Sequence, residues 1–290
     1  YHAFPAALPG GFTGVDIFFV ISGFLISGIL FDNLAAGSFS FAEFYRRRIT
    51  RIFPALIVVL GASLAFGAMT LVADELRQLG KHTAAGAGFV SNLVLWQETG
   101  YFDNAAETKP LLHLWSLGIE EQFYLAWPLC VYLAWRSRLA LAPVVAATVA
   151  GSFAWNIVSL SGSPEGVFYS PLTRLWELAI GGVLALAGSG GFRASRGVAA
   201  APGSAAAPPL AARAAPLGAA LVAAGALVVD GTRVFPGWWA LLPVTGAALL
   251  IAAGPAAWFN RTVLASPVLV WFGLISYPLY LWHWPLLSFA

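Results

Sequence analysis

The segment Pro110–Tyr124 places an imidazole, a carboxylate and a phenol at helical spacing, at the head of a long apolar run. In a helix, His113, Glu120 and Tyr124 stand at i, i+7 and i+11, so their side chains lie along one stripe. Titratable groups are costly at membrane depth, and those that occur there mark functional sites. The stripe therefore predicts one wall of a proton-handling site.

Glu120 and Glu121 are adjacent carboxylates, which must point to different faces of one helix. We expect one of them to face the interior of a helix bundle and the other to face a polar loop or a cation such as Lys109 or Arg174. His113 has an alternative role, which is to tie the preceding loop to the helix without taking part in chemistry.

A second candidate pair is His2 with Asp16, which stands at the head of another apolar run. A carboxylate that orients an imidazole holds the tautomer whose other nitrogen accepts a proton, as general-base catalysis requires. Taken alone, a histidine near a helix end is more commonly an interfacial residue, and Asp16 also serves as a favourable N-terminal helix charge. Ser22 and Gly23, further along, are small residues of the kind that let membrane helices approach closely.

Four arginines lie in the segment 46–51, and two of them, Arg48 and Arg51, are three residues apart and share a helical face. Guanidinium groups bind phosphate oxygens bidentately, so this face, with Arg47 beside it, is suited to a phosphorylated donor such as coenzyme A. The alternative is that the cluster anchors the helix to anionic lipid headgroups.

Arg174 and Glu177 are also three residues apart. An internal ion pair that fixes the register of a helix explains them as well as a catalytic role does. His283 lies between two tryptophans and before a proline, a pattern typical of an interfacial aromatic belt.

The composition indicates an integral membrane protein. Of 290 residues, 59% are hydrophobic and 10% are charged, and the mean hydropathy is +0.79, so the main solvent of the chain is lipid. The net charge of +2 is too small to indicate a nucleic acid partner. The single cysteine, Cys130, excludes an intrachain disulfide and a cysteine metal site.

Apolar runs near the ~20 residues that a membrane-spanning helix needs recur along the chain. We expect an all-α, polytopic transmembrane bundle with a short re-entrant or interfacial helix at 82–97. The eight predicted spans lie near residues 14–34, 52–73, 113–135, 139–160, 172–188, 216–230, 238–254 and 265–289. The positive-inside rule places the arginine-rich segment 46–51 in the cytoplasm, and the later arginine-rich loops then also fall inside. His2, His113 and the two glutamates fall toward the outer face.

We expect one membrane domain over residues 1–290, with a flexible cytoplasmic loop at 189–215 that is rich in Gly, Ala, Ser, Pro and Arg. The first residues, Tyr1–Pro5, have the character of a loop that enters a span. We therefore expect a helix to precede them in the full-length protein and the chain to be truncated at both ends.

Seven blocks of the sequence resemble the successive signatures of the type-3 membrane acyltransferases, multi-pass proteins of the bacterial inner membrane that O-acylate cell-surface polysaccharides and related glycans. In chain order the blocks are YHAFP, GGFTGVDIFFVISGFLI, FYRRRITRIFPAL, SNLVLWQETGYFD, KPLLHLWSLGIEEQFYLAWPL, SPLTRLWELAIGG and ISYPLYLWHWPLL. The resemblance covers nearly the whole chain. It is closest to the branch that carries an extracytoplasmic SGNH hydrolase-like domain after the membrane domain, and it implies about ten spans of bilayer-crossing length in the full family fold.

The resemblance implies roles for individual residues. His2 matches the proposed catalytic histidine of the family, which Asp16 or Glu120 would orient, and Arg48 and Arg51 match its paired-arginine motif. The remaining matches are Phe18, Phe19, Ser22 and Gly23 to a Phe-Phe-x-x-Ser-Gly motif, and Glu120 to Tyr124 to a Glu-Glu-Gln-Phe-Tyr block.

The implied reaction moves an acyl group, most often acetyl, from cytoplasmic acetyl-CoA to a hydroxyl of a surface glycan such as lipopolysaccharide, or of a lipid-linked sugar. No metal and no permanently bound cofactor is expected. The residues expected to support substrate or structure are His113, Ser22, Glu121, Tyr124, Arg174 and Glu177. Two other classes stay open, a proton-coupled exporter of a lipid-linked sugar or small molecule and a non-enzymatic membrane scaffold.

Overall fold

The computed structural model describes residues 6–98, 108–162, 164–188 and 209–290, and within these ranges the protein is all α, as predicted. The helices are α1 (Gly14–Ala35), α2 (Phe41–Thr70), α3 (Ala73–Ala87), α4 (Ser91–Glu98), α5 (Leu114–Arg136), α6 (Leu141–Ser159), α7 (Pro164–Tyr169), α8 (Pro171–Gly188), α10 (Pro209–Val228), α11 (Leu241–Ala253) and α12 (Pro267–Ser288). Short helical turns form η1 (Gly11–Thr13), η3 (Gly237–Ala240) and η4 (Asn260–Leu264).

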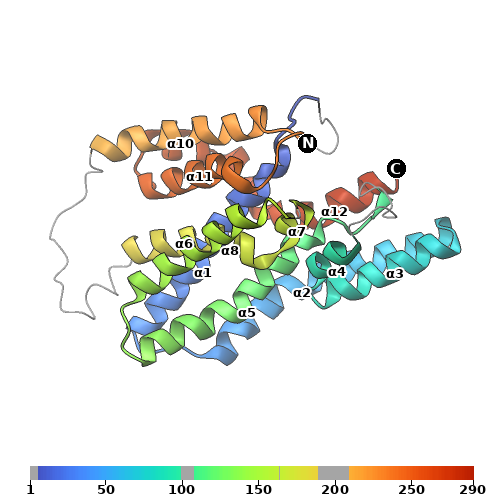
Figure 1. Ribbon diagram of the computed structural model, residues 1–290, viewed down its shortest axis with the longest axis horizontal. Coiled ribbons are helices and arrows are strands. Elements are labelled where there is room, and N and C mark those ends of the chain that lie inside the picture. Colours follow the sequence, from blue (N-terminus) through green and yellow to red (C-terminus); the bar gives the residue numbers. More distant parts are fainter. Residues whose placement is uncertain (1–5, 99–107, 163, 189–208) are drawn as a thin grey trace.

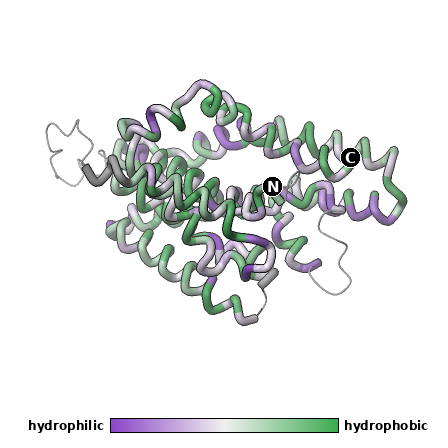
Figure 2. The backbone as a smooth tube through the Cα atoms, turned by 90° about the horizontal axis from the view of Figure 1, so that it is seen from above, coloured by the Kyte–Doolittle hydropathy of each residue, from purple (hydrophilic) through white to green (hydrophobic). Residues whose placement is uncertain are grey.

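The long helices form a bundle around α1 and α8. These two helices pack along each other, α6 packs on α8, and α5 lies beside α1 (Figure 1). The pair α10 and α11 covers one side of the bundle, while α2, α3 and α12 extend on the other (Figure 1). Figure 2 shows that apolar residues occupy most of the length of these helices. The arrangement leaves α2, α4 and α5 close together on the side away from α10.

Three helical stretches in the described ranges have the length and hydropathy of a membrane span: Gly11–Ala35, Phe41–Thr70 and Leu141–Ser159. Ala214–Val228 and Gly237–Ala253 are shorter apolar helices. Large apolar side chains lie on the outside of these helices, and Phe18 and Val58, for example, are 45% and 60% exposed. An apolar surface of this extent is expected where lipid covers the protein.

Every predicted span coincides with a helix, but two boundaries differ. The run predicted at 52–73 belongs to α2, which begins at Phe41 because the Ser40 hydroxyl accepts a hydrogen bond of 3.4 Å from the backbone N–H of Glu43. The run predicted at 216–230 begins at Pro209. The loop predicted at 189–215 is therefore wrong from Pro209 onward, and its first part lies outside the described residues.

The prediction of one short helix at 82–97 is wrong, because α3 and α4 are separate helices joined by Gly88, Phe89 and Val90. The backbone N–H groups of Val90 and Phe89 donate to the carbonyls of Ala85 and Gly86 at 2.9 and 3.2 Å, the pattern of a Schellman turn. Phe89 takes the left-handed conformation of this turn, with φ of 55°. Glycine normally occupies that position. Because phenylalanine stands there instead, the sequence did not indicate that α3 ends before it.

Glycines let α1 and α8 pack backbone against backbone. A Cβ atom on Gly23 would lie 1.8 Å from the carbonyl oxygen of Leu178, and one on Gly181 would lie 2.3 Å from the amide nitrogen of Phe24. Side chains larger than hydrogen do not fit at these points. The prediction that Gly23 is a packing residue is confirmed, and the contact fixes the depth of α1 against the rest of the bundle.

Substitution of Gly181 by alanine is expected to destabilise the protein by about 1–3 kcal/mol, because the added methyl group must push α1 and α8 apart. The measurement is thermal unfolding of the purified protein in detergent. Gly28→Ala on the partner helix α1 is the control, since a Cβ atom there meets no heavy atom of a neighbouring segment within 4 Å. Equal losses of stability in the two variants would contradict this account of the contact.

Candidate functional site

A buried cluster of hydrogen bonds joins α1 to α5. The Ser22 hydroxyl donates to Oε1 of Glu120 at 2.6 Å and also lies 2.6 Å from the phenol oxygen of Tyr124. The Tyr124 hydroxyl donates to the same carboxylate oxygen. All three side chains are buried. Two hydroxyl groups thus fix the Glu120 carboxyl inside the bundle, where an unpartnered polar group would be costly.

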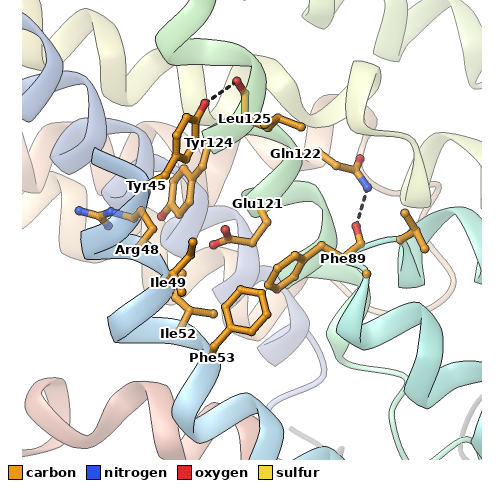
Figure 3. A pocket seen from close by; sticks show the side chains of 12 residues that line it. Tyr45, Arg48, Ile49, Ile52, Phe53, Phe89, Glu121, Gln122, Tyr124 and Leu125 are labelled. Carbon is orange, nitrogen blue, oxygen red and sulfur yellow. Dashed lines mark hydrogen bonds between the residues drawn. The ribbon is translucent and has the colours of Figure 1, made fainter. Parts of the chain in front are cut away.

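A cavity of about 310 Å³ lies beside this cluster, between α2, α5 and the connection from α3 to α4 (Figure 3). Its size falls at the small end of the range for ligand sites. Most of its wall is apolar, and the charged side chains in it are those of Arg48 and Glu121. The lining residues are Tyr45, Arg48, Ile49, Ile52, Phe53, Gly88, Phe89, Val90, Glu121, Gln122, Tyr124 and Leu125.

Glu120 and Glu121 point to different faces, and Glu120 lies in the interior of the bundle, as predicted. The other half of the prediction, that the second glutamate faces a polar loop, is wrong, because Glu121 faces a mostly apolar cavity. Glu121 points into the cavity (Figure 3). The two cations expected near this pair are engaged elsewhere. Lys109 pairs with Glu98 at 3.0 Å, and Arg174 pairs with Asp16 and Glu177.

The four arginines at the start of α2 are not equivalent. Arg46 and Arg47 both pair with Glu43, at 2.8 and 2.5 Å. The Arg48 guanidinium instead lies over the rings of Phe44 and Tyr124, with its central carbon 5.8 and 5.6 Å from the ring centres. Within the described ranges, Arg48 has no carboxylate in ion-pair contact, and its Nε is buried without a hydrogen-bond partner. Arg48 is thus the arginine best placed to receive an anion.

Arg51, one turn beyond Arg48, is exposed, and no acidic side chain in the described part of the chain pairs with it. Arg47, which the sequence grouped with Arg48 and Arg51, is held by Glu43 on the exposed face of α2. The three predicted donor-binding arginines therefore separate into one paired and two unpaired cations.

Side-chain amides hold the connection between α3 and α4 against α5. The Gln122 amide donates to the carbonyl of Phe89 and to Oδ1 of Asn92, each at 2.9 Å. Asn92 in turn donates to the carbonyl of Tyr169 at 3.1 Å. Gly118 allows the close approach, since a Cβ atom there would lie 2.8 Å from Asn92 Oδ1. Gln122 and Asn92 lie in two of the sequence blocks named above, but their contact was not predicted, although polar amides in apolar helices are a signal for such contacts.

A second polar centre is wholly buried between α1 and α8. Arg174 Nη1 lies 3.0 Å from Asp16 Oδ1 and 2.8 Å from Glu177 Oε1. All three side chains have 0% exposure. The predicted internal pair of Arg174 with Glu177 is therefore confirmed, and it includes Asp16 as a third member.

The Arg174 guanidinium is enclosed by aromatic rings as well. Its central carbon lies between 5.5 and 5.7 Å from the ring centres of Phe19, Trp115, Phe168 and Phe235. Such contacts favour a cation in a site without water. Asp16 was expected to orient His2, and His2 lies outside the described residues. In the structure, Asp16 forms an ion pair with Arg174.

His113 and Tyr124 stand at opposite ends of the predicted stripe, and only Glu120 and Tyr124 share one cluster. His113 precedes α5, and its ring centre lies 5.2 Å from that of Tyr280 and 5.3 Å from that of His283. The Tyr280 hydroxyl donates to the His113 carbonyl at 2.5 Å. His283, predicted to belong to an interfacial belt, thus lies in a group of polar residues with rings, of which His113 precedes α5 and the other two belong to α12.

A cluster of charged side chains around Glu98 joins α3 to α4. Glu98 lies 2.6 Å from Lys81 Nζ, 3.0 Å from Lys109 Nζ and 3.0 Å from His82 Nε2. Burial raises the pKa of the Glu98 carboxyl, but hydrogen bonds from Lys81 and Lys109 outweigh that effect and the pKa lies below its usual value. The carboxylate therefore stays charged near neutral pH and ties the two helices together. Within the described ranges, no group of three His, Cys, Asp or Glu side chains is placed to hold a metal ion.

Comparison with known proteins matches residues 2–290 to the family described as acyltransferase domain. The chain is 32% identical over 286 residues to a putative peptidoglycan O-acetyltransferase of Bacillus subtilis, covering 96% of this chain and 44% of that protein. It is 29% identical over 295 residues to a peptidoglycan O-acetyltransferase of Listeria monocytogenes, covering 99% of this chain and 47% of that protein. The chain thus spans under half the length of these two relatives.

An uncharacterized protein of Haemophilus influenzae is 36% identical over 180 residues, which cover 59% of this chain and 74% of that protein. No solved structure matches the chain.

Replacement of Arg174 by methionine is expected to destabilise the protein by about 3–5 kcal/mol, because it leaves the carboxyl groups of Asp16 and Glu177 buried without their cation. Thermal unfolding in detergent measures the loss. Arg47→Met is the control, and it should change stability by at most about 1 kcal/mol because its ion pair with Glu43 is exposed. A small loss for Arg174→Met, similar to that of the control, would show that the buried ion pair does not hold α1 and α8 together.

Proposed function

Because the chain belongs to the acyltransferase domain family, we propose that it forms the membrane part of an enzyme that moves an acyl group, acetyl in the simplest case, from cytoplasmic acyl-CoA to a hydroxyl of a cell-surface glycan. One observation carries the proposal. The unpaired guanidinium of Arg48 and the carboxylate of Glu121 face one cavity, whose wall also contains Tyr124 from the buried Glu120 cluster. An anion site and a proton-handling site are thereby adjacent.

The donor enters, in this proposal, from the cytoplasmic end of α2. The helix begins at Phe41, and its arginines lie near that end, which the positive-inside rule assigns to the cytoplasm. Arg48 and Arg51 bind phosphate oxygens of the donor, while Arg47 remains with Glu43. Charge-assisted hydrogen bonds of this kind are about twice as strong as neutral ones. The cavity beyond them receives the acyl arm.

The chemical step exchanges a thioester for an oxygen ester. The acceptor hydroxyl oxygen attacks the thioester carbonyl carbon, the C–O bond forms, and the C–S bond breaks to release the thiolate of coenzyme A. The hydroxyl proton passes to a base, for which His2 is the proposed residue, and then to the leaving thiolate. Base assistance of this kind supplies about 10² to 10⁴-fold of the rate.

Glu120 is proposed to orient the base. Its Oε1 accepts hydrogen bonds from Ser22 and Tyr124, so the carboxyl group cannot rotate freely. A fixed carboxyl group selects the tautomer and the orientation of an imidazole that bonds to it. Asp16, the other carboxylate considered for this role, is engaged with Arg174 in the structure.

The proposed topology has eight crossings, with the ends that carry Arg136 and Arg261 on the same side as Arg48. The relatives named as peptidoglycan O-acetyltransferases make a cell-wall glycan the first acceptor to test. Those relatives are longer than this chain. An extracytoplasmic SGNH-like domain in the full-length protein is accordingly proposed as the partner that receives the acyl group or presents the glycan.

The test supplies acetyl-CoA labelled in the acetyl group to membranes that contain the full-length protein, and measures label bound covalently to the glycan fraction. Arg48→Ala is expected to lower transfer at least about tenfold, since a hydrogen bond to a charged group contributes about 1.5–3 kcal/mol. His2→Ala is expected to lower it about 10² to 10⁴-fold.

Arg46→Ala is the matched control for Arg48→Ala, because Arg46 is one of the arginines that pair with Glu43. It should retain transfer near the wild-type level. Transfer that survives both Arg48→Ala and His2→Ala would reject the proposal. Movement of a lipid-linked sugar across the membrane, with no acyl ester formed, would favour an exporter.

A further inference from the structure

We propose that Phe53 and Phe89 form the end wall of the cavity and restrict the donor to short acyl chains. The inference rests on the proposed function and deepens it, because it names the class of acyl group that the cavity accepts. It is carried by three features of the described residues: the direction of the cavity, the contact between the two rings, and the backbone conformation of Phe89.

The cavity has two different ends (Figure 3). At one end, the Tyr45 hydroxyl of α2 donates to the carbonyl of Leu125 at 3.1 Å. At the other end, the rings of Phe53 and Phe89 meet edge to face, with centres 5.4 Å apart and an angle of 86° between their planes. Tyr45 lies closer than Phe53 to the arginine-rich start of α2. A donor that enters from that start therefore meets the two rings last.

The two rings offer an acyl chain no polar partner, and they lie against each other in the wall at one end of the cavity. Between the two ends lie Arg48 and Glu121, which are the charged groups of the wall. The anionic part of a donor is stabilised beside the Arg48 guanidinium, and the apolar tip extends toward the rings. A rigid aromatic wall at the tip limits the number of methylene groups, because interiors are close-packed and extra methylenes force neighbours to move.

Phe89 holds its ring at this point by a backbone conformation that an aromatic residue rarely adopts. Its φ of 55° belongs to the Schellman position that glycine usually fills. Gln122 fixes the same residue through a hydrogen bond of 2.9 Å to its carbonyl. Strained residues held by their surroundings cluster at functional sites. The ring that this turn holds packs against Phe53 and lines the cavity.

The experiment measures how acyl-CoA compounds of increasing chain length compete with labelled acetyl-CoA for binding to the full-length protein in membranes. In the wild type, butyryl-CoA should compete at least about tenfold more weakly than acetyl-CoA, since one methylene in an apolar pocket changes binding about 10 to 200-fold. Phe53→Ala and Phe89→Gly should each reduce this difference to about threefold or less, because the shortened wall leaves room for the added methylene groups. Both variants should still bind acetyl-CoA.

Phe66→Ala is the matched control. Phe66 also lies on α2 and also packs edge to face, against Phe289 with ring centres 5.0 Å apart, but it does not line the cavity. This variant should keep the wild-type preference. Phe53→Ala does not change the residue in the strained turn. Its chain-length preference therefore tests the end wall even if Phe89→Gly no longer binds acetyl-CoA.

Two results have different meanings. If the wild type binds acetyl-CoA through Arg48 and both cavity variants keep its chain-length preference, the end wall is refuted while the proposed function stands. If the wild type shows no binding of acetyl-CoA that depends on Arg48, the donor step of the proposed function fails and the end wall fails with it.

Discussion

The structure depends on one constraint, which is that a charge placed inside a bundle of apolar helices needs a partner to offset the cost of its burial. A lone ion in such an interior is far costlier than one in water. Arg174 meets the constraint with Asp16, Glu177 and a set of aromatic rings. Glu120 meets it with the hydroxyls of Ser22 and Tyr124. Both solutions join α1 to another helix, so the polar contacts also fix the positions of the helices.

The same constraint distinguishes structural from functional groups. Glu43 neutralises Arg46 and Arg47, and the second buried centre contains its own counter-ions. Arg48 lies over aromatic rings and has no carboxylate of the described residues within ion-pair distance, and it faces the cavity that Glu121 also lines. An anion from outside the chain would complete its surroundings. The account of donor binding follows from this difference between neighbouring arginines and not from their number.

The sequence predicted what short-range periodicity determines and missed what long-range packing determines. Helix positions, the division of Glu120 from Glu121 and the pair of Arg174 with Glu177 follow from hydropathy and helical spacing within one segment. The bond from Ser22 to Glu120 joins residues 98 positions apart, and no pattern along the chain indicates it. The turn at Phe89 was missed because an aromatic residue stands where glycine is usual, and the pairing of Arg47 was missed because Glu43 was not considered.

The central claim is that the buried Glu120 cluster belongs to a site that passes an acyl group from one side of the membrane to the other. Sealed inside-out vesicles that contain the full-length protein and a glycan acceptor in the lumen test it most directly, with labelled acetyl-CoA added only outside. The account predicts that ester-linked label accumulates on the lumenal glycan and that Glu120→Gln abolishes most of it while the protein remains folded. Label that appears only when acetyl-CoA is placed in the lumen, or that is unchanged in Glu120→Gln, would contradict the account.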